Sequence, residues 1–429
     1  MPESLCELAA LVRRGDVSPA ELVRRHLDAI RPELNAFVAI REQAIEEAPT
    51  APDGPLRGVP ITIKDSFDVA GLPTRSGSRF RPDTPAIADA PAVARLRAAG
   101  AIVIGKTNTP ELLASYETDN YLTGRTNNPY DLDRTPGGSS GGEAAAIASG
   151  CSAGGLASDG GGSIRVPAHF CGIAGLKPTP GRIPTAGHYP PIELSSVTVA
   201  GPMARTAEDL RLLFSVLAEP RDAPRGPVRI GVWEQFYGVP IDAEIREAVR
   251  RAGHLLGAEE FAPTGLERAP NVWAFLFSRV PAFLIHRLMA GRQAEAHWTL
   301  TESLAAGDPP TAGEVVQMIA ERDRLRDWLL RQMAGVPVIV MPVAGITAFR
   351  HRERRFPVDG NDVGLFQAMM PSVIANVLGL PSVTVPVALS SAGLPIGVQL
   401  LGRPFEDELL LEIAMRLTAC KPFPPSSRI

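Results

Sequence analysis

The stretch between residues 137 and 165 constrains the fold more than any other part of the chain. A Gly-Gly-Ser-Ser-Gly-Gly run occupies residues 137–142, and alanine dominates residues 143–149 directly after it. Because alanine favours helices and glycine permits tight turns, this order predicts a helix with the glycine-serine run at its N-terminus. A second run, Ser-Asp-Gly-Gly-Gly-Ser-Ile-Arg at residues 158–165, predicts another tight turn soon after that helix.

Strand and helix patterns alternate along the chain. Residues 59–64 are short and β-branched, residues 92–99 have a helical pattern that Gly100 ends, and residues 101–104 are entirely apolar. This order predicts a β-α-β unit in a largely parallel sheet, with Lys64 at the end of a strand. Further helices are predicted at about residues 19–30, 206–217 and 314–333, and further strands at residues 336–343 and 382–387.

Composition excludes several classes of function. With 429 residues, the chain is long enough for one large α/β domain, or for a core with an insertion. A net charge of −4 creates no strong field, so we expect a small neutral ligand, no nucleic acid and no membrane partner, while a homodimer stays open. The N-terminus has no basic and apolar leader, and no apolar run approaches the ~18 residues of a spanning helix, so we expect a cytoplasmic protein.

Cysteine spacing gives no sign of a metal centre. The four cysteines, Cys6, Cys151, Cys171 and Cys420, form no C-x-x-C pair and no cluster with histidine. This pattern argues against a zinc site and against a disulfide framework. We therefore expect no metal and no cofactor.

Two short motifs match the sequence patterns of other kinds of site, a phosphate-binding loop and a nucleophile elbow. Residues 100–107 fit the spacing of a phosphate-binding P-loop, but the residues between its glycines have the pattern of a buried strand, which cannot wrap its amides around a phosphate. Residues 137–141 fit the G-x-S-x-G nucleophile elbow, which needs a strand just before the serine. The preceding residues instead include two prolines, two asparagines and two aspartates. Nucleotide binding and a Ser-His-Asp triad are therefore the weaker interpretations.

Serine and lysine together suggest nucleophilic acyl transfer without histidine. A serine hydroxyl needs a base to become a good nucleophile, and a lysine is such a base only when its amine is neutral. Burial can lower a lysine pKa from ~10.4 to ~7, at a cost of about 4 to 5 kcal/mol. Gly160, Gly161 and Gly162 can bring several backbone N–H groups together, which suits an oxyanion hole. A tight turn is the preferred explanation of a lone glycine triplet, but the second serine run and the lysine reverse that preference.

At these residues the sequence resembles the amidase signature family. The features typical of that family are the Gly-Gly-Ser-Ser-Gly-Gly segment and a following Asp-x-Gly-Gly-Ser-Ile-Arg segment. Ser158 and Gly160 stand here where the family more often has threonine. The resemblance implies an α/β fold, an α/β/α sandwich with a large central mixed β-sheet. It also covers residues 58–65, 105–108, 124–129, 171–178, 201–205 and 379–386.

The resemblance also implies a Ser-cisSer-Lys triad, in which Lys64 is the base, Ser139 the bridging serine and Ser163 the nucleophile. The implied reaction is hydrolysis of a carboxamide C–N bond through a Ser163 acyl-enzyme, with ester or carbamate cleavage as a side activity. Further implied roles are the oxyanion-hole amides of Gly160, Gly161, Gly162 and Ser163, supporting side chains at Ser140, Asp159 and Arg165, and a border of the substrate site at Leu113 and Tyr116.

One alternative function comes from the same family, which includes the A-type component of glutamyl-tRNA amidotransferase, a glutaminase in a transamidation complex. A binding protein without chemistry is disfavoured because no triad position is missing. The aromatic residues between Trp273 and Trp298 can line an apolar pocket or fill a helical core, so the nature of the amide stays open. We expect a single amidase domain over residues 1–429, with a helical segment at about 1–50, a motif-bearing core at about 51–217 and 366–420, and a variable substrate-side region at about 218–365.

Overall fold

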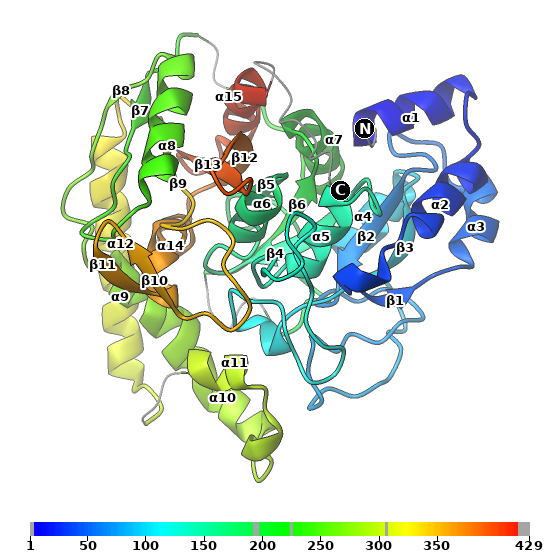
Figure 1. Cartoon of the computed structure of the whole chain (residues 1–429), viewed down its shortest axis with the longest axis horizontal. Coiled ribbons are helices and arrows are strands. Elements are labelled where there is room, and N and C mark those ends of the chain that lie inside the picture. The colour runs from blue at the N-terminus through cyan, green and yellow to red at the C-terminus, as the bar shows by residue number, and fades with distance from the viewer. Residues whose placement is uncertain (1–3, 192–196, 224–225, 305–307, 419–429) are drawn as a thin grey trace.

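One large β-sheet organises the chain, whose computed structural model is shown in Figure 1. The structure describes residues 4–191, 197–223, 226–304 and 308–418, so Cys420 and the end of the expected core lie outside the described residues. The sheet has 11 strands in the order β1 (Phe37–Ile40), β3 (Ile102–Thr107), β2 (Pro60–Lys64), β4 (Gly154–Asp159), β6 (Val199–Ala204), β5 (Ala174–Lys177), β12 (Ser382–Leu389), β13 (Pro395–Gly402), β9 (Val338–Pro342), β7 (Ile230–Val232) and β8 (Glu259–Glu260).

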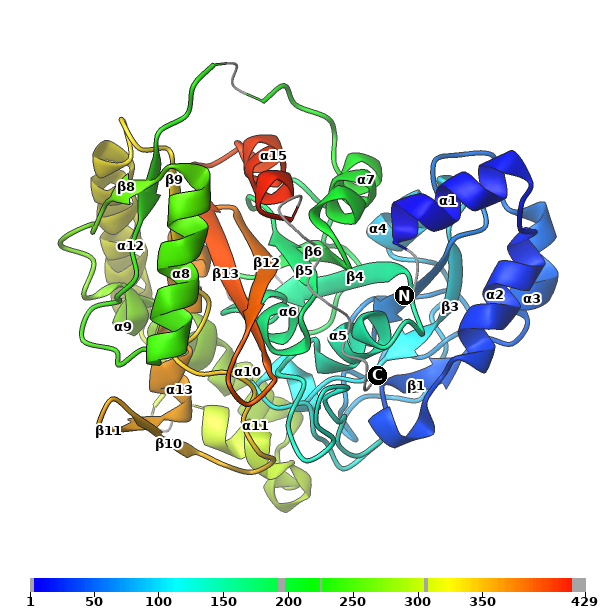
Figure 2. The same ribbon diagram turned by 45° about the horizontal axis from the view of Figure 1, so that its top comes forward.

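Helices cover both faces of this sheet (Figures 1 and 2). The first face carries α4 (Pro91–Ala98), α7 (Ala207–Leu217), α8 (Ala243–Leu256) and α15 (Asp407–Thr418), with α1 (Leu5–Arg14) packed on α7. The second face carries α5 (Gly141–Ala148), α6 (Arg165–Cys171) and α14 (Met370–Val377), while α2 (Pro19–Asp28) and α3 (Ala44–Glu47) pack beside β3. The expected α/β/α sandwich is therefore confirmed.

Strand β9 illustrates why a continuous apolar run is needed at this position. Val338 and Val340 belong to the apolar cluster of the first face, whereas Ile339 and Met341 belong to the cluster beneath α14. Because successive side chains of a strand point to opposite faces, a strand covered on both faces must be apolar at every position.

The prediction of a largely parallel sheet is wrong, because the sheet is mixed. Parallel pairs are confined to β3-β2-β4 and to β9-β7-β8. The strands between β4 and β9 all pair antiparallel, and so does the edge strand β1. At the centre, β12 and β13 are joined only by residues 390–394, and so short a connection permits only an antiparallel pair.

Local signals located several elements correctly. The Ser18 hydroxyl accepts a hydrogen bond from the Glu21 N–H and caps α2, as the Ser-Pro-Ala-Glu pattern predicts. Helix α5 begins at Gly141, two residues before the predicted start, since the glycines after Ser140 already belong to its first turn. Strand β3 continues through Thr107, which confirms that the P-loop-like residues form a strand.

The region between β6 and β9 contributes further helices. These are α9 (Ala269–Ala274), a π-helical segment (Phe275–Arg279), α10 (Val280–Leu288), α11 (Trp298–Ser303) and α12 (Ala312–Gln332). In Figure 1, α10 and α11 extend at the bottom of the molecule, away from the sheet. A hairpin of β10 (Arg355–Val358) and β11 (Asn361–Gly364) leads into α13 (Leu365–Ala368). None of the helices in the described part of the chain combines the length and hydrophobicity that crossing a membrane requires.

Candidate active site

Lys64 ends β2 and has no exposed surface. Its Nζ lies 2.8 Å from Ser139 Oγ, 3.1 Å from Ser158 Oγ and 3.4 Å from the Ser158 carbonyl oxygen. Burial lowers the pKa of Lys64 from its ordinary value of 10.5 to about 7, although the charges of Asp159 and Glu143 oppose this shift. A substantial fraction of the amine is therefore neutral near pH 7.

The two serine runs meet in front of Lys64. The Gly138–Ser139 peptide bond is cis, as the resemblance implies, and Ser139 lies just before α5. Ser163 lies just before α6, and its carbonyl oxygen accepts a hydrogen bond of 3.2 Å from the Ser140 N–H. Ser139 and Ser163 line the same cavity. The fold thus gathers at one site three side chains that are far apart in the sequence.

Hydrogen bonds hold the glycine loop between β4 and α6 on both sides. Asp159 accepts hydrogen bonds of 2.7 Å from the Gly162 N–H and 3.0 Å from the Ile164 N–H. From the opposite direction, Trp273 Nε1–H donates to the Gly160 carbonyl and the Tyr116 hydroxyl donates to the Gly161 carbonyl, each at 2.7 Å.

Only glycine fits at the centre of this loop. A Cβ at Gly161 would collide with the indole ring of Trp273, and Gly162 has a φ of +114°, a backbone conformation that other residues rarely adopt. The backbone of the loop therefore packs directly against the Trp273 indole, and the hydrogen bonds from Trp273 and Tyr116 fix the orientation of its peptide planes.

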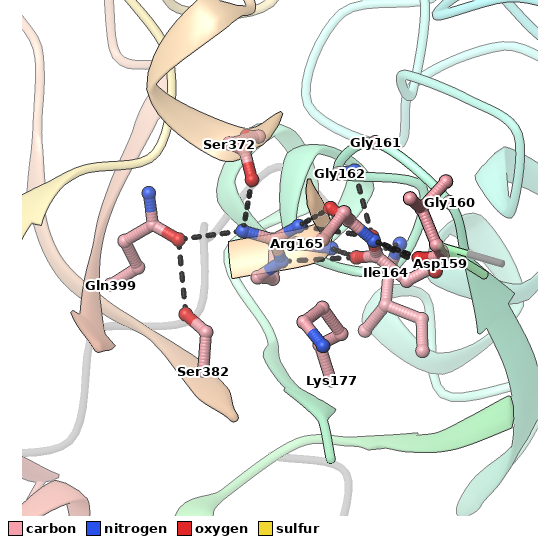
Figure 3. A network of polar contacts seen from close by, with 12 residues as sticks. Asp159, Gly160, Gly161, Gly162, Ile164, Arg165, Lys177, Ser372, Ser382 and Gln399 are labelled. Carbon is pink, nitrogen blue, oxygen red and sulfur yellow. Dashed lines mark hydrogen bonds and ion pairs between the residues drawn. The ribbon is translucent and has the colours of Figure 1, made fainter. Parts of the chain in front are cut away.

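Arg165 is fully buried at the centre of the network in Figure 3. Its Nε and Nη2 each lie 3.0 Å from the Asp159 carboxylate, while Nη1 donates to the Ser372 carbonyl at 2.7 Å and to Gln399 Oε1 at 2.8 Å. Burial alone would raise the pKa of Asp159, but the Arg165 guanidinium, the charge of Lys177 and the Gly162 N–H together outweigh it and hold that pKa well below its usual range. Asp159 therefore stays ionised and keeps its bonds to the loop amides.

Two further buried ionisable groups surround the site, and sequence reasoning gave neither of them a role. Glu143 on α5 accepts hydrogen bonds from the Thr62 and Thr107 hydroxyls, and burial raises its pKa to about 7. Lys177 ends β5 near Arg165 (Figure 3), and burial lowers its pKa to about 7. Lys177 lies in a segment that matches the family, but that match alone indicates no interaction.

Two apolar cavities adjoin Ser163, and we name them the first and the second cavity. Leu113 lines both cavities, and Tyr116 lines the second. The first cavity is lined by Ser139, Ser163, Leu113, Leu284, Ile285 and Leu288, among others. The second is lined by Ser163, Leu113, Tyr116, Trp273, Phe366 and Met370, among others.

Sequence reasoning missed several residues of this site. Ser158 contacts Lys64 directly, although the sequence marks it only as a departure from the family wording. Trp273 is one of several aromatics that suit either a pocket or a core, and it serves both purposes, since it lines the second cavity and is nearly buried. No signal in the sequence pointed to Leu284 or Met370. In the described ranges, no group of three or more His, Cys, Asp or Glu side chains is arranged to hold a metal ion.

Comparison with known proteins identifies the family and matches the fold. The sequence matches the family model Amidase over residues 21–411. The A-type component of glutamyl-tRNA(Gln) amidotransferase from Thermus thermophilus is 33% identical over 95% of each chain. Indoleacetamide hydrolase from Bradyrhizobium diazoefficiens is 33% identical over 96% of this chain and 85% of that protein. A crystal structure of an amidase superimposes with a TM-score of 0.89 at 31% identity and covers 97% of this chain and 100% of that chain.

A mixed eleven-stranded sheet with helices on both faces is the fold of the amidase signature enzymes. The chain belongs to the Amidase family, and it is an amidase. The resemblance inferred from its motifs is therefore confirmed.

Proposed function

We propose that the protein hydrolyses a carboxamide C–N bond through an acyl-enzyme on Ser163, with Ser139 as proton relay and Lys64 as base. The observation that carries this proposal is the 2.8 Å separation of Lys64 Nζ and Ser139 Oγ inside a fully buried site. A neutral amine has one lone pair and two N–H donors. The lone pair accepts the Ser139 proton, and the two donors point to the Ser158 hydroxyl and carbonyl oxygens.

The reaction proceeds in two halves. Lys64 takes a proton from Ser139 as Ser139 takes one from Ser163, whose Oγ attacks the carbonyl carbon. When the C–N bond breaks, Ser139 donates a proton to the departing nitrogen and Lys64 returns its own to Ser139. Water then cleaves the acyl ester by the same relay and releases the carboxylate. Esters and carbamates are expected side substrates, because an alkoxide leaves with less need of a proton.

Activity is expected to rise with pH through about 7, the pKa of Lys64, because only the neutral amine accepts a proton. Below that pH the lysine is protonated, so kcat/KM should fall about tenfold for each pH unit. The measurement is kcat/KM for one amide between pH 5 and pH 9.

Glu143 provides the control for this pH profile, since its pKa also lies at about 7. Glu143→Gln removes that titration and keeps hydrogen-bonding atoms beside Thr62 and Thr107. The acid limb should persist in this variant. A profile that becomes flat in Glu143→Gln would assign the limb to the carboxyl group and contradict the role of Lys64.

The glycine loop supplies the donors for the tetrahedral oxyanion in this proposal. The Gly162 N–H already donates to Asp159, so the amides of Gly160, Gly161 and Ser163 are left as the principal donors. In a trans peptide the N–H points away from the preceding C=O. The bond from Trp273 to the Gly160 carbonyl therefore sets the direction of the Gly161 N–H, which makes Trp273 a positioning residue.

Trp273→Phe should lower kcat about tenfold, because the loop loses one hydrogen bond that aims an oxyanion donor. For a small substrate such as an acetyl amide, KM should change less than about twofold. The measurement is kcat and KM for that amide. Trp233→Phe is the matched control, since Trp233 is another buried tryptophan of the same apolar cluster and lines neither cavity. If kcat falls equally in Trp273→Phe and Trp233→Phe, Trp273 contributes only packing and does not position the loop.

Glutaminase action in a transamidation complex is the second candidate, because an A-type component of an amidotransferase is among the relatives. Glutamine carries an α-ammonium and an α-carboxylate, which need opposite charges when they leave water. Among the described residues that line either cavity, the charged side chain is Glu302, in the second cavity, and Arg354 Nε already donates to it at 2.9 Å. No described lining residue is a lysine or arginine that would receive the carboxylate.

The experiment that tests the proposed function offers the purified protein uncharged amides and glutamine side by side. Release of amine or ammonia from the uncharged amides, together with labelling of Ser163 by a fluorophosphonate, supports the hydrolase. Ammonia release from glutamine that grows when the other components of an amidotransferase are added would support the second candidate instead.

A further inference from the structure

Ser163 lies where the two apolar cavities meet. Phe277 and Leu113 also line both cavities. Phe277 is held in place by stacking on Trp273, with ring centroids 5.0 Å apart and an interplanar angle of 14°. The reacting carbonyl of a substrate at Ser163 therefore has two apolar cavities beside it.

The first cavity offers no described charged group to a ligand. The helix α10 contributes Leu284, Ile285 and Leu288, and the basic side chain His188 is neutral because burial lowers its pKa to about 3. A charged substituent would lose its hydration there without gaining an opposite charge. An apolar substituent instead gains about fourfold in affinity for each methylene that becomes buried.

The position of Ser139 assigns a chemical role to each cavity. Ser139 lines the first cavity and is absent from the lining of the second, whereas Ser163 lines both. The departing nitrogen must receive a proton as the C–N bond breaks, and in the relay that proton comes from Ser139. The nitrogen and its substituent therefore face the first cavity, and the acyl chain extends into the second, toward Trp273 and Met370.

We propose that the substrate is an uncharged N-substituted carboxamide with an apolar group on each side of the scissile bond. The amine substituent packs against α10 in the first cavity, and the acyl group packs against Trp273 and Met370 in the second. This inference rests on the proposed function. Hydrolysis breaks the C–N bond, takes up one water and releases a carboxylate and an apolar amine. A primary amide, which releases ammonia, would leave the first cavity unfilled.

The test uses amides that vary each side independently, namely N-methyl and N-benzyl amides of acetic and hexanoic acid, with primary hexanamide as a fifth substrate. The wild-type protein should hydrolyse N-benzylhexanamide with the highest kcat/KM, at least about tenfold above N-methylhexanamide and above N-benzylacetamide. Primary hexanamide should be slower than N-benzylhexanamide by at least the same factor.

Two substitutions test the cavities, and each of them fills one cavity. Leu284→Trp fills the first and should lower the ratio of N-benzyl to N-methyl turnover about tenfold with either acid. Met370→Trp fills the second and should lower the ratio of hexanoyl to acetyl turnover about tenfold with either amine. Because each ratio compares substrates on one variant, a general loss of stability cancels.

Neighbouring positions provide the matched controls. Phe283 precedes Leu284 on α10 but is 39% exposed and lines neither cavity, and Gln367 is an exposed residue near Met370. Phe283→Trp and Gln367→Trp should leave both ratios unchanged.

The outcomes separate this inference from the proposed function. If Leu284→Trp alters the acyl ratio instead of the amine ratio, the assignment of the cavities is overturned. If primary hexanamide is turned over faster than N-benzylhexanamide, or if no substituted amide is hydrolysed although Ser163 is labelled by a fluorophosphonate, the substrate class is overturned while the nucleophile stands. Failure of the wild-type protein to be labelled at Ser163 overturns the proposed function itself.

Discussion

Replacing Ser163 with alanine is expected to lower kcat for amide hydrolysis by about 10⁴-fold or more, because no acyl-enzyme can form without its Oγ. What remains is catalysis by the oxyanion donors acting on water, which is slow without a positioned nucleophile. The loss should appear in single-turnover measurements of amine release, and labelling by a fluorophosphonate should disappear with it.

Ser149→Ala is the matched control for this substitution. Ser149 follows α5, and its Oγ donates to the Ala145 carbonyl at 2.7 Å, so it shares the helix that carries the active-site serine run without contacting Lys64. The control should keep activity within about twofold of the wild type, as expected for a substitution away from the site. Retention of more than a few per cent of kcat in Ser163→Ala would contradict the proposed mechanism.

Lys64→Met is expected to lower kcat about 10³-fold, within the range that a positioned general base contributes. The same substitution should stabilise the fold. Burial lowers the pKa of Lys64 from 10.5 in the unfolded chain to about 7 in the native state. Between these two pH values the lysine is mostly protonated in the unfolded chain and mostly neutral in the native state. The native state therefore loses stability as pH falls from about 10 toward 7. Methionine removes this penalty, and the midpoint of thermal unfolding should rise more at pH 8 than at pH 10.

Lys106→Met is the contrasting control for Lys64→Met. Lys106 is also fully buried, but its Nζ lies 2.7 Å from Asp65 Oδ1. Removing its charge leaves a buried carboxylate without its partner, which should lower the unfolding midpoint. A variant Lys64→Met that keeps wild-type turnover would exclude the lysine as the base. One that unfolds at a much lower temperature would show that the amine is charged in the native state.

The sequence was most informative where a short run of residues determines the local backbone conformation. The glycine-serine runs set tight turns before α5 and α6, and those turns bring Ser139 and Ser163 to the end of β2. The proximity of both serines to Lys64 was predictable because each of the three residues lies in a short recognisable motif. The roles assigned to these residues stay predictions until the variants are measured.

Other features depend on packing between distant segments, which a single sequence does not reveal. The antiparallel centre of the sheet was missed because alternation of helices and strands is the same for several strand orders. Trp273 and Leu284 have the helical spacing of core residues. Only the docking of α9 against the glycine loop, and the position of α10 beside the first cavity, bring them to the site. The division into a core and a variable region likewise stays a prediction.

The anchoring of Arg165 has a consequence for synthesis of the chain. Lys64 and both serines are translated within the first 163 residues, but the groups that fix Arg165 include Ser372 and Gln399. A nascent chain that has emerged only as far as α12 thus contains all three side chains of the proposed triad and lacks Ser372 and Gln399, which bind the Arg165 guanidinium. These contacts can form only after residue 399 has been synthesised, so we expect hydrolytic competence to arise late in synthesis.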